Sequence, residues 1–201
     1  QLFYQPTFSY NFYDGLILGL KMHNKPLIKR NLEFTISPGY ATKSNKLNGS
    51  LSVLYNQFFE DTSLYKISYG IVGNTLQYAP DLSYSSLIPY VDIQFKRKSL
   101  RDATSKFIRA KVVHINKEIS PLATKSEQDN YNVLSLSYNY INPDIIEETR
   151  YKFSTEFAKN FSKVSADFRY RTLTSSDTQL DFRVFAGAFI HNNSKGDYFS
   201  F

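Results

Sequence analysis

Apolar and polar side chains alternate one by one along most of this sequence, and this period of two is what most constrains its fold. Residues 163–171 read KVSADFRYR and residues 134–140 read LSLSYNY, so every second side chain is apolar. Successive side chains of a β-strand point to opposite faces, whereas helices repeat every 3.6 residues. The pattern therefore predicts half-buried strands, each with one apolar and one polar face.

The alternating segments are also long. We count roughly eleven of them, many about 9 to 13 residues long, whereas globular strands average about 5 to 6 and membrane-crossing strands need about 9 to 11. The predicted spans are 2–12, 15–23, 31–41, 48–58, 64–74, 86–97, 106–117, 131–142, 149–159, 163–173 and 178–190. We predict an all-β fold, an antiparallel up-and-down transmembrane β-barrel or a large part of one, with roughly ten to eleven long strands.

The connectors between these segments are rich in turn-forming residues. Short ones lie at 13–15, 24–26, 43–46 and 60–63, and longer polar ones at 99–105, 119–130 and 142–148. Asp14-Gly15 predicts a tight hairpin turn, and Gly19 predicts a place where strands approach or bend. Short turns on one side and longer loops on the other are typical of a membrane barrel. We expect a single domain over residues 1–201, as a segment of a longer chain because it begins at Gln1.

Charged residues stand in the middle of several predicted strands. They are expected to line a wet lumen, at Lys152, Glu156, Asp167, Arg169, Arg171, Asp181 and Arg183. Aromatic residues near strand ends are expected to form the interfacial girdles of a barrel. These are Tyr10, Phe12, Tyr13, Tyr40, Phe58, Phe59 and Tyr140. In a soluble sandwich the charged face would instead be solvated, and strand length favours the barrel.

Composition narrows the class further. The chain has 16 Tyr and 17 Phe but no Cys, and no apolar run is long enough for a transmembrane helix. The net charge of +6 is scattered along the chain, and where basic and aromatic residues adjoin they point to opposite faces. A nucleic-acid surface would need both on one face, so no nucleic-acid partner is predicted.

No catalytic, cofactor or metal site is predicted. His23, His114 and His191 lie far apart and outside any HExxH pattern, and cysteine ligands are absent. The acidic groups at 60–61 and 144–148 fall in expected turns, where carboxylates are normally solvated. There is no GxSxG, GxGxxG or P-loop motif, so we expect neither an enzyme nor a bound cofactor.

Residues 11–20 (NFYDGLILGL), 23–27 (HNKPL), 31–34 (NLEF), 38–42 (PGYAT) and 196–201 (GDYFSF) carry a resemblance to a known family. They resemble the β-barrel region that follows an aminopeptidase-like (gluzincin) metallopeptidase domain in certain Gram-negative bacteria. The YDG-then-GL opening is also similar to barrels of the outer-membrane assembly-factor superfamily. The resemblance implies an outer-membrane barrel that anchors or accompanies a peptidase domain of the same chain, and in that family the barrel would continue beyond Phe201. The zinc-binding motif of that peptidase is absent here, so no catalytic residue is carried over.

The expected function is a membrane anchor or pore scaffold in the bacterial outer membrane, with the lipid bilayer as partner. One alternative is a translocator or transport barrel of the assembly-factor type. The other is a soluble, secreted β-sandwich or lipocalin-like binding module.

Overall fold

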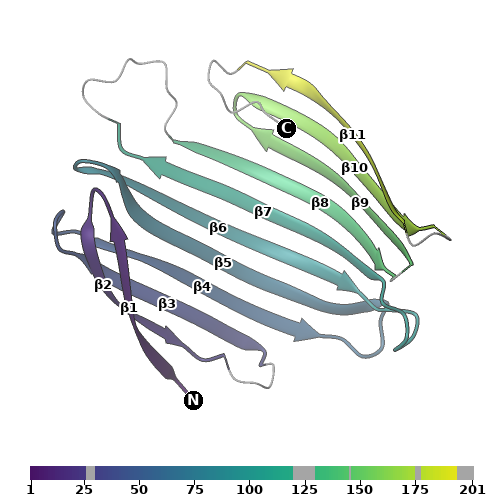
Figure 1. Cartoon of the computed structure of the whole chain (residues 1–201), viewed down its shortest axis with the longest axis horizontal. Helices are drawn as coiled ribbons and strands as arrows, with labels where there is room; N and C mark the ends of the chain where they lie inside the picture. Colours follow the sequence, from purple (N-terminus) through teal and green to yellow (C-terminus); the bar gives the residue numbers. More distant parts are fainter. Residues whose placement is uncertain (26–29, 120–129, 145, 175–177, 194–201) are drawn as a thin grey trace. The chain divides into compact units, whose positions relative to one another are not determined.

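The protein is all-β: in the part of the chain that the structure describes there are eleven strands and no helix (Figure 1). The computed structural model describes residues 1–25, 30–119, 130–144, 146–174 and 178–193. The strands are β1 (Phe3–Asn11), β2 (Gly15–His23), β3 (Leu32–Ala41), β4 (Leu47–Phe58), β5 (Leu64–Ala79), β6 (Leu82–Phe95), β7 (Ser105–Lys117), β8 (Tyr131–Pro143), β9 (Glu147–Ala158), β10 (Phe161–Leu173) and β11 (Gln179–Asn192).

Each strand is hydrogen-bonded to its neighbours in sequence, in the order β1 to β11, and the pairing is antiparallel. The predicted all-β, up-and-down sheet of long strands is therefore confirmed, and each predicted segment corresponds to one strand. Among the described residues β1 and β11 have one neighbour each, which agrees with a large part of a barrel. That the sheet crosses a membrane stays a prediction.

The prediction was wrong at the β5–β6 hairpin. It ended one strand at 74 and began the next at 86, whereas β5 continues to Ala79 and β6 starts at Leu82. Only Pro80 and Asp81 connect them, and Asp81 has a φ of 58°. Proline followed by a residue with positive φ is the arrangement of a tight β-turn. The alternation continues on both sides of this turn, with Leu76 and Tyr78 before it and Leu82 and Tyr84 after it, so the two-residue turn was missed although the strand pattern was present.

The predicted β8–β9 connector, 142–148, was also too long, because β8 extends to Pro143 and β9 begins at Glu147. Two glycine predictions fit what the structure shows. Gly15 has a φ of 69° at the β1–β2 turn, a conformation that favours glycine. A Cβ at Gly19 would lie 2.6 Å from Thr7 Oγ1, so the strands approach closely there.

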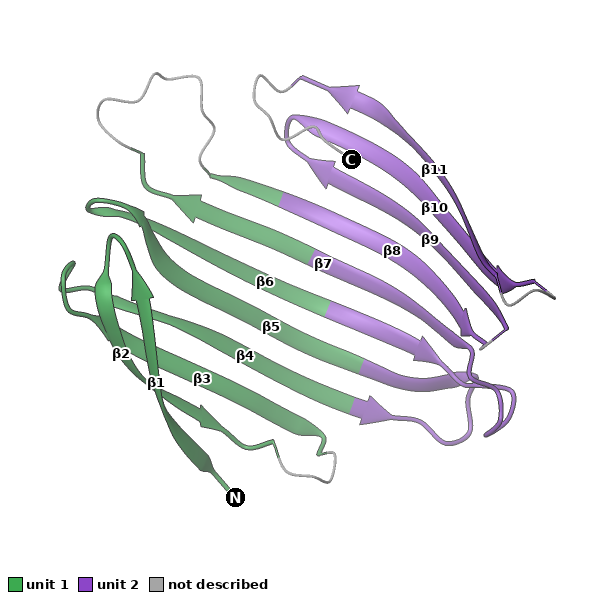
Figure 2. Ribbon diagram, in the orientation of Figure 1, with its two compact units in different colours: residues 1–56, 68–90, 112–132 green, residues 57–67, 91–111, 133–201 purple. Residues whose placement is uncertain are grey.

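The chain divides into two compact units whose segments interleave along the sequence (Figure 2). Unit 1 comprises residues 1–56, 68–90 and 112–132, and unit 2 comprises residues 57–67, 91–111 and 133–201. Each unit is described by itself. The single domain expected over 1–201 stays a prediction.

In unit 1 the strand register gathers apolar side chains on one face. Phe8 lies opposite Leu18. Leu18 lies opposite Tyr40, and Tyr40 opposite Leu47. These four side chains are exposed, Phe8 by 72% and Leu47 by 75%. The opposite face carries mostly small or polar residues, such as Ser37 opposite Ser50.

The same division holds in unit 2. Tyr140 lies opposite Tyr151, Tyr151 opposite Phe168, and Phe168 opposite Val184. The rings of Tyr140 and Tyr151 stack with centroids 4.5 Å apart. Both units therefore present a continuous apolar face, several strands wide, to their surroundings.

The buried residues among those that the structure describes are mainly polar. Among the described residues the buried apolar side chains are Ala41, Val133 and Phe161. The buried polar ones are more numerous: Asp14, Asn48, Asn56, Ser68, Gln77, Ser135, Ser137 and Glu148. The described residues contain no helix long and apolar enough to cross a membrane.

Candidate functional site

The charged face is the side of β9–β11 that lies opposite Phe153, Phe168 and Val184. The antiparallel register brings ten charged residues onto it because each occupies the alternate position of its strand. They are Glu148, Arg150, Lys152, Glu156, Lys163, Asp167, Arg169, Arg171, Asp181 and Arg183.

Three arginines stand side by side on this face. Arg169 of β10 lies opposite Arg150 of β9 and opposite Arg183 of β11. We call Arg150, Arg169 and Arg183 the arginine row. Like charges directly opposite on neighbouring strands repel, so the row needs compensating carboxylates nearby.

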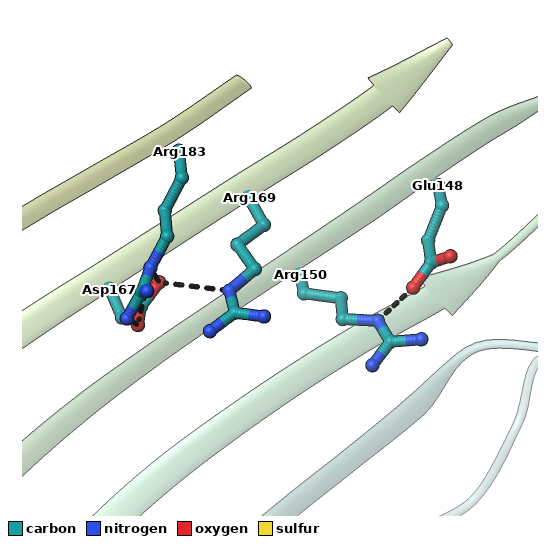
Figure 3. Close-up of polar contacts among 5 residues, drawn as sticks. All are labelled: Glu148, Arg150, Asp167, Arg169 and Arg183. Atoms are coloured by element: carbon teal, nitrogen blue, oxygen red, sulfur yellow. Dashed lines mark hydrogen bonds and ion pairs between the residues drawn. The ribbon is translucent and has the colours of Figure 1, made fainter. Parts of the chain in front are cut away.

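Two carboxylates provide that compensation, and each serves two guanidinium groups. Figure 3 shows Glu148 beside Arg150, and Asp167 beside both Arg169 and Arg183. Glu148 pairs with Arg150 Nε, and its Oε2 lies 2.5 Å from Arg171 Nη2. Asp167 Oδ2 lies 2.5 Å from Arg183 Nη2, and Asp167 Oδ1 lies 3.5 Å from Arg169 Nε. Along the strands, Glu148 therefore lies on one side of the arginine row and Asp167 lies on the other.

Exposure differs sharply between the two kinds of group. The side chains of Glu148 and Asp167 are 9% and 20% exposed. Those of Arg150, Arg169 and Arg183 are 52%, 56% and 54% exposed. The carboxylates thus lie beneath, and the guanidinium groups face outward. The guanidinium groups of the arginine row border a depression of about 380 Å³.

All seven residues predicted to line a lumen lie on this charged face. Lys152 is opposite Asp167, and Arg171 is opposite Asp181. Glu156 lies opposite Lys163 and pairs with it at 3.2 Å. Whether the face borders a lumen stays a prediction.

The predicted lumen-lining residues omitted Glu148, Arg150 and Lys163, although the alternation of residues 163–171 already places Lys163 on the same face as Asp167. The sequence places Glu148 in an expected connector, whereas it belongs to β9 and is buried. Arg150 and Lys163 alternate in phase with Lys152 and Asp167, so extending the same parity along each strand would have found them.

The predicted girdle aromatics divide between strand ends and strand interiors. Tyr10 and Tyr40 lie near the ends of β1 and β3, and Phe58 ends β4. Phe12 and Tyr13 lie in the β1–β2 turn with their rings edge to face, and Phe59 follows β4. Tyr140 lies within β8, three residues before its end, stacked on Tyr151. Tyr10 and Phe12 are the most exposed of the set, at 74% and 70%.

A second polar cluster, in unit 1, was not predicted. Asp14 is fully buried and accepts hydrogen bonds from Asn11 Nδ2 (3.1 Å), Ser44 Oγ (2.7 Å) and Asn48 Nδ2 (2.7 Å). The Lys43 amide also donates to the Asp14 carbonyl at 2.9 Å. The cluster therefore joins the β1–β2 turn to the β3–β4 hairpin.

The cluster reaches one strand further. Asn11 Nδ2 donates to the carbonyl of Gln77 at 2.9 Å, although β1 and β5 are not neighbours in the sheet. Lys46 Nζ donates to the carbonyl of Asp81 at 3.2 Å. The sheet of unit 1 is therefore curved enough to bring the end of β1 against β5.

No metal centre emerges in the described part of the chain, where no three His, Cys, Asp or Glu residues gather. His23 stacks on Phe3, and His114 contacts Asn132. His23 thus has an aromatic neighbour, and His114 has a polar one.

Comparison with known proteins finds no matching family model, no matching curated protein and no matching solved structure.

Proposed function

We propose that this chain is a segment of a bacterial outer-membrane β-barrel that serves as a membrane anchor or pore scaffold and carries out no catalysis itself. The observation that carries the proposal is the distribution of side chains across the sheet. Long apolar faces are exposed while the buried positions are mainly polar. A bilayer solvates such an apolar face, and paired strands satisfy the backbone groups that lipid cannot.

Strand length supports the same assignment. The strands β3 to β11 have between 10 and 16 residues. A strand tilted across the hydrocarbon core needs about 9 to 11 residues. Exposed rings near strand ends, such as Tyr10 and Tyr40, suit the two interfaces of a bilayer.

A soluble binding module, the most distant alternative, would bury its apolar face in a core. The described residues have only three buried apolar side chains, so that module would need a second layer to cover the sheet. A transport barrel of the assembly-factor type is the nearer alternative. It is favoured by the charged face, whose exposed arginines suit a water-filled passage better than a dry plug.

The family resemblance adds a partner to this proposal. A metallopeptidase domain elsewhere in the same protein would then use the sheet as its attachment to the membrane. Peptidase activity of the natural full-length protein in membrane fractions would test that association separately.

The first experiment is to fold the 201-residue chain in plain buffer, in detergent micelles and in lipid vesicles. We expect a β-rich far-ultraviolet dichroism spectrum and heat-modifiable gel mobility in micelles and vesicles only. A monodisperse β-rich protein in plain buffer would overturn the membrane assignment and favour the soluble module. Single-channel conductance of the vesicle-folded chain would then distinguish a passive anchor from a pore.

A further inference from the structure

The arginine row has more positive charge than its surroundings neutralise. Three registered rows cross β9, β10 and β11 at this point: Glu148, Arg171, Asp181; then Arg150, Arg169, Arg183; then Lys152, Asp167, Phe185. They hold five cationic groups against three carboxylates. Two positive charges therefore remain within a small area of one face.

The ion pairs leave some of the N–H donors of the arginine row unused. Arg150 and Arg169 meet their carboxylates through Nε, so their terminal amino groups lie outside these pairs (Figure 3). A guanidinium group carries five N–H donors in a planar fork, a geometry that matches two oxygens of one oxyanion. The less exposed carboxylates of Glu148 and Asp167 fix the position of these forks before any ligand arrives, which lowers the entropy cost of binding.

We propose that the arginine row binds a small doubly charged oxyanion, of which phosphate is the type. The surplus of two charges, the outward guanidinium groups and the depression of about 380 Å³ that they border together define this ligand class. A carboxylate dianion shares the chemistry but lacks the tetrahedral arrangement of oxygens. The inference deepens the proposed function, on which it rests for placing the charged face beside water.

The test is titration of the detergent-folded full chain with inorganic phosphate, followed by calorimetry at low ionic strength. We expect saturable binding that Arg169→Gln weakens about tenfold, because a charge-assisted bidentate contact is lost. Arg169→Lys keeps the charge but not the fork, so it should recover only part of the affinity. Succinate, a dicarboxylate of equal charge, should bind more weakly than phosphate.

Two further variants control for folding and for total charge. Asp167→Asn removes the carboxylate that positions Arg169 and Arg183, so phosphate binding should weaken even though the net positive charge of the face rises. Arg97→Gln removes an equal charge from an exposed position after β6 and should leave the affinity unchanged. If Arg97→Gln and Arg169→Gln weaken binding equally, phosphate responds only to net charge and the site is overturned.

The outcomes for the site and for the proposed function remain distinguishable. Heat-modifiable mobility is recorded on the same samples as the titration. A chain that folds in detergent but does not bind phosphate overturns the oxyanion site alone. A chain that folds in plain buffer and binds phosphate through Arg169 overturns the membrane assignment and supports the site.

Discussion

Phe168 and Arg169 are adjacent in β10, yet they lie on opposite faces and belong to different chemical surroundings. Phe168 lies between Tyr151 and Val184, whereas Arg169 lies between Arg150 and Arg183. In a barrel, the first would meet lipid and the second would meet water. Substitutions at these two positions therefore test the facing of the sheet at the scale of single side chains.

We predict that Phe168→Lys destabilises the vesicle-folded chain by about 2–4 kcal/mol, the cost of a lysine on the lipid face near the bilayer midplane. Arg169→Leu should have little effect, because it removes one of three adjacent like charges. Urea unfolding in phosphatidylcholine vesicles measures both. Equal costs for the two variants would show that the facing is wrong.

Asp14 is the other residue at which the structure predicts a specific effect of substitution on stability. Removing a carboxylate that accepts hydrogen bonds from three side chains leaves the buried amide donor of Asn48 without this partner. Asp14→Ala is therefore expected to cost about 1–3 kcal/mol or more in unfolding free energy. The matched control is Asp61→Ala, an exposed turn residue, which should change stability by less than about 0.5 kcal/mol. A similar small effect at both positions would rule out a structural role for the cluster.

At the scale of elements, the β6–β7 loop carries its own pH dependence. Asp102 accepts hydrogen bonds from the amides of Thr104 (2.9 Å) and Lys98 (3.1 Å). The backbone hydrogen bond from Thr104, then that from Lys98, lowers the pKa of Asp102 below its ordinary value of 3.8. Because the folded form favours the ionised carboxylate, this contribution is complete above the ordinary pKa and is lost as pH falls below it.

We therefore expect the loop around Asp102 to loosen only under strongly acidic conditions, below about pH 3.8. The amide resonances of Lys98 and Thr104 in detergent micelles, followed against pH, would report the change. In Asp102→Asn these resonances should no longer titrate in that range. A midpoint above the ordinary aspartate pKa would contradict the hydrogen-bonding pattern.

At the scale of the whole molecule, the two outer strands differ from the inner ones. β1 and β11 each have one neighbour in the strand order, so their outward N–H and C=O groups have no ladder partner among the described strands. Natural proteins cover or pair such edges, because they invite association with other chains. The backbone hydrogen bonding of β1 and β11 therefore depends more than that of the inner strands on the other strands or chains that lie beside them.

We predict that amide hydrogen exchange of the micelle-folded chain is faster in β1 and β11 than in β2 and β10. The physical reason is that an edge strand leaves alternate amides outside the ladder. Peptide-resolved mass spectrometry measures the rates. Equal protection of all four strands would mean that the edges are paired with each other or with a second copy.

The sequence by itself determined the eleven strands, the alternation of apolar and polar side chains along them, and which side chains of a strand share a face. This was possible because the period of two is a local property of an extended chain, and a slip by one residue would reverse both faces. It succeeded at β10, where Asp167, Arg169 and Arg171 alternate with Phe168 and Tyr170. The prediction failed at 75–79 and 82–85, because the short Pro80-Asp81 turn was not recognised, although Leu76 and Tyr78, then Leu82 and Tyr84, continue the alternation.

Only the tertiary structure decided which side chains from different strands meet. The opposition of Arg169 to both Arg150 and Arg183 depends on the register between strands, which is fixed by pairing along their whole length. The approach of Asn11 to Gln77 depends on how far the sheet curves, and so does the burial of Asp14 between two hairpins. Likewise Tyr90 covers Gly70, where a Cβ would lie 2.1 Å from the ring. Such contacts link residues far apart in sequence, and a local pattern carries no information about the distance between them.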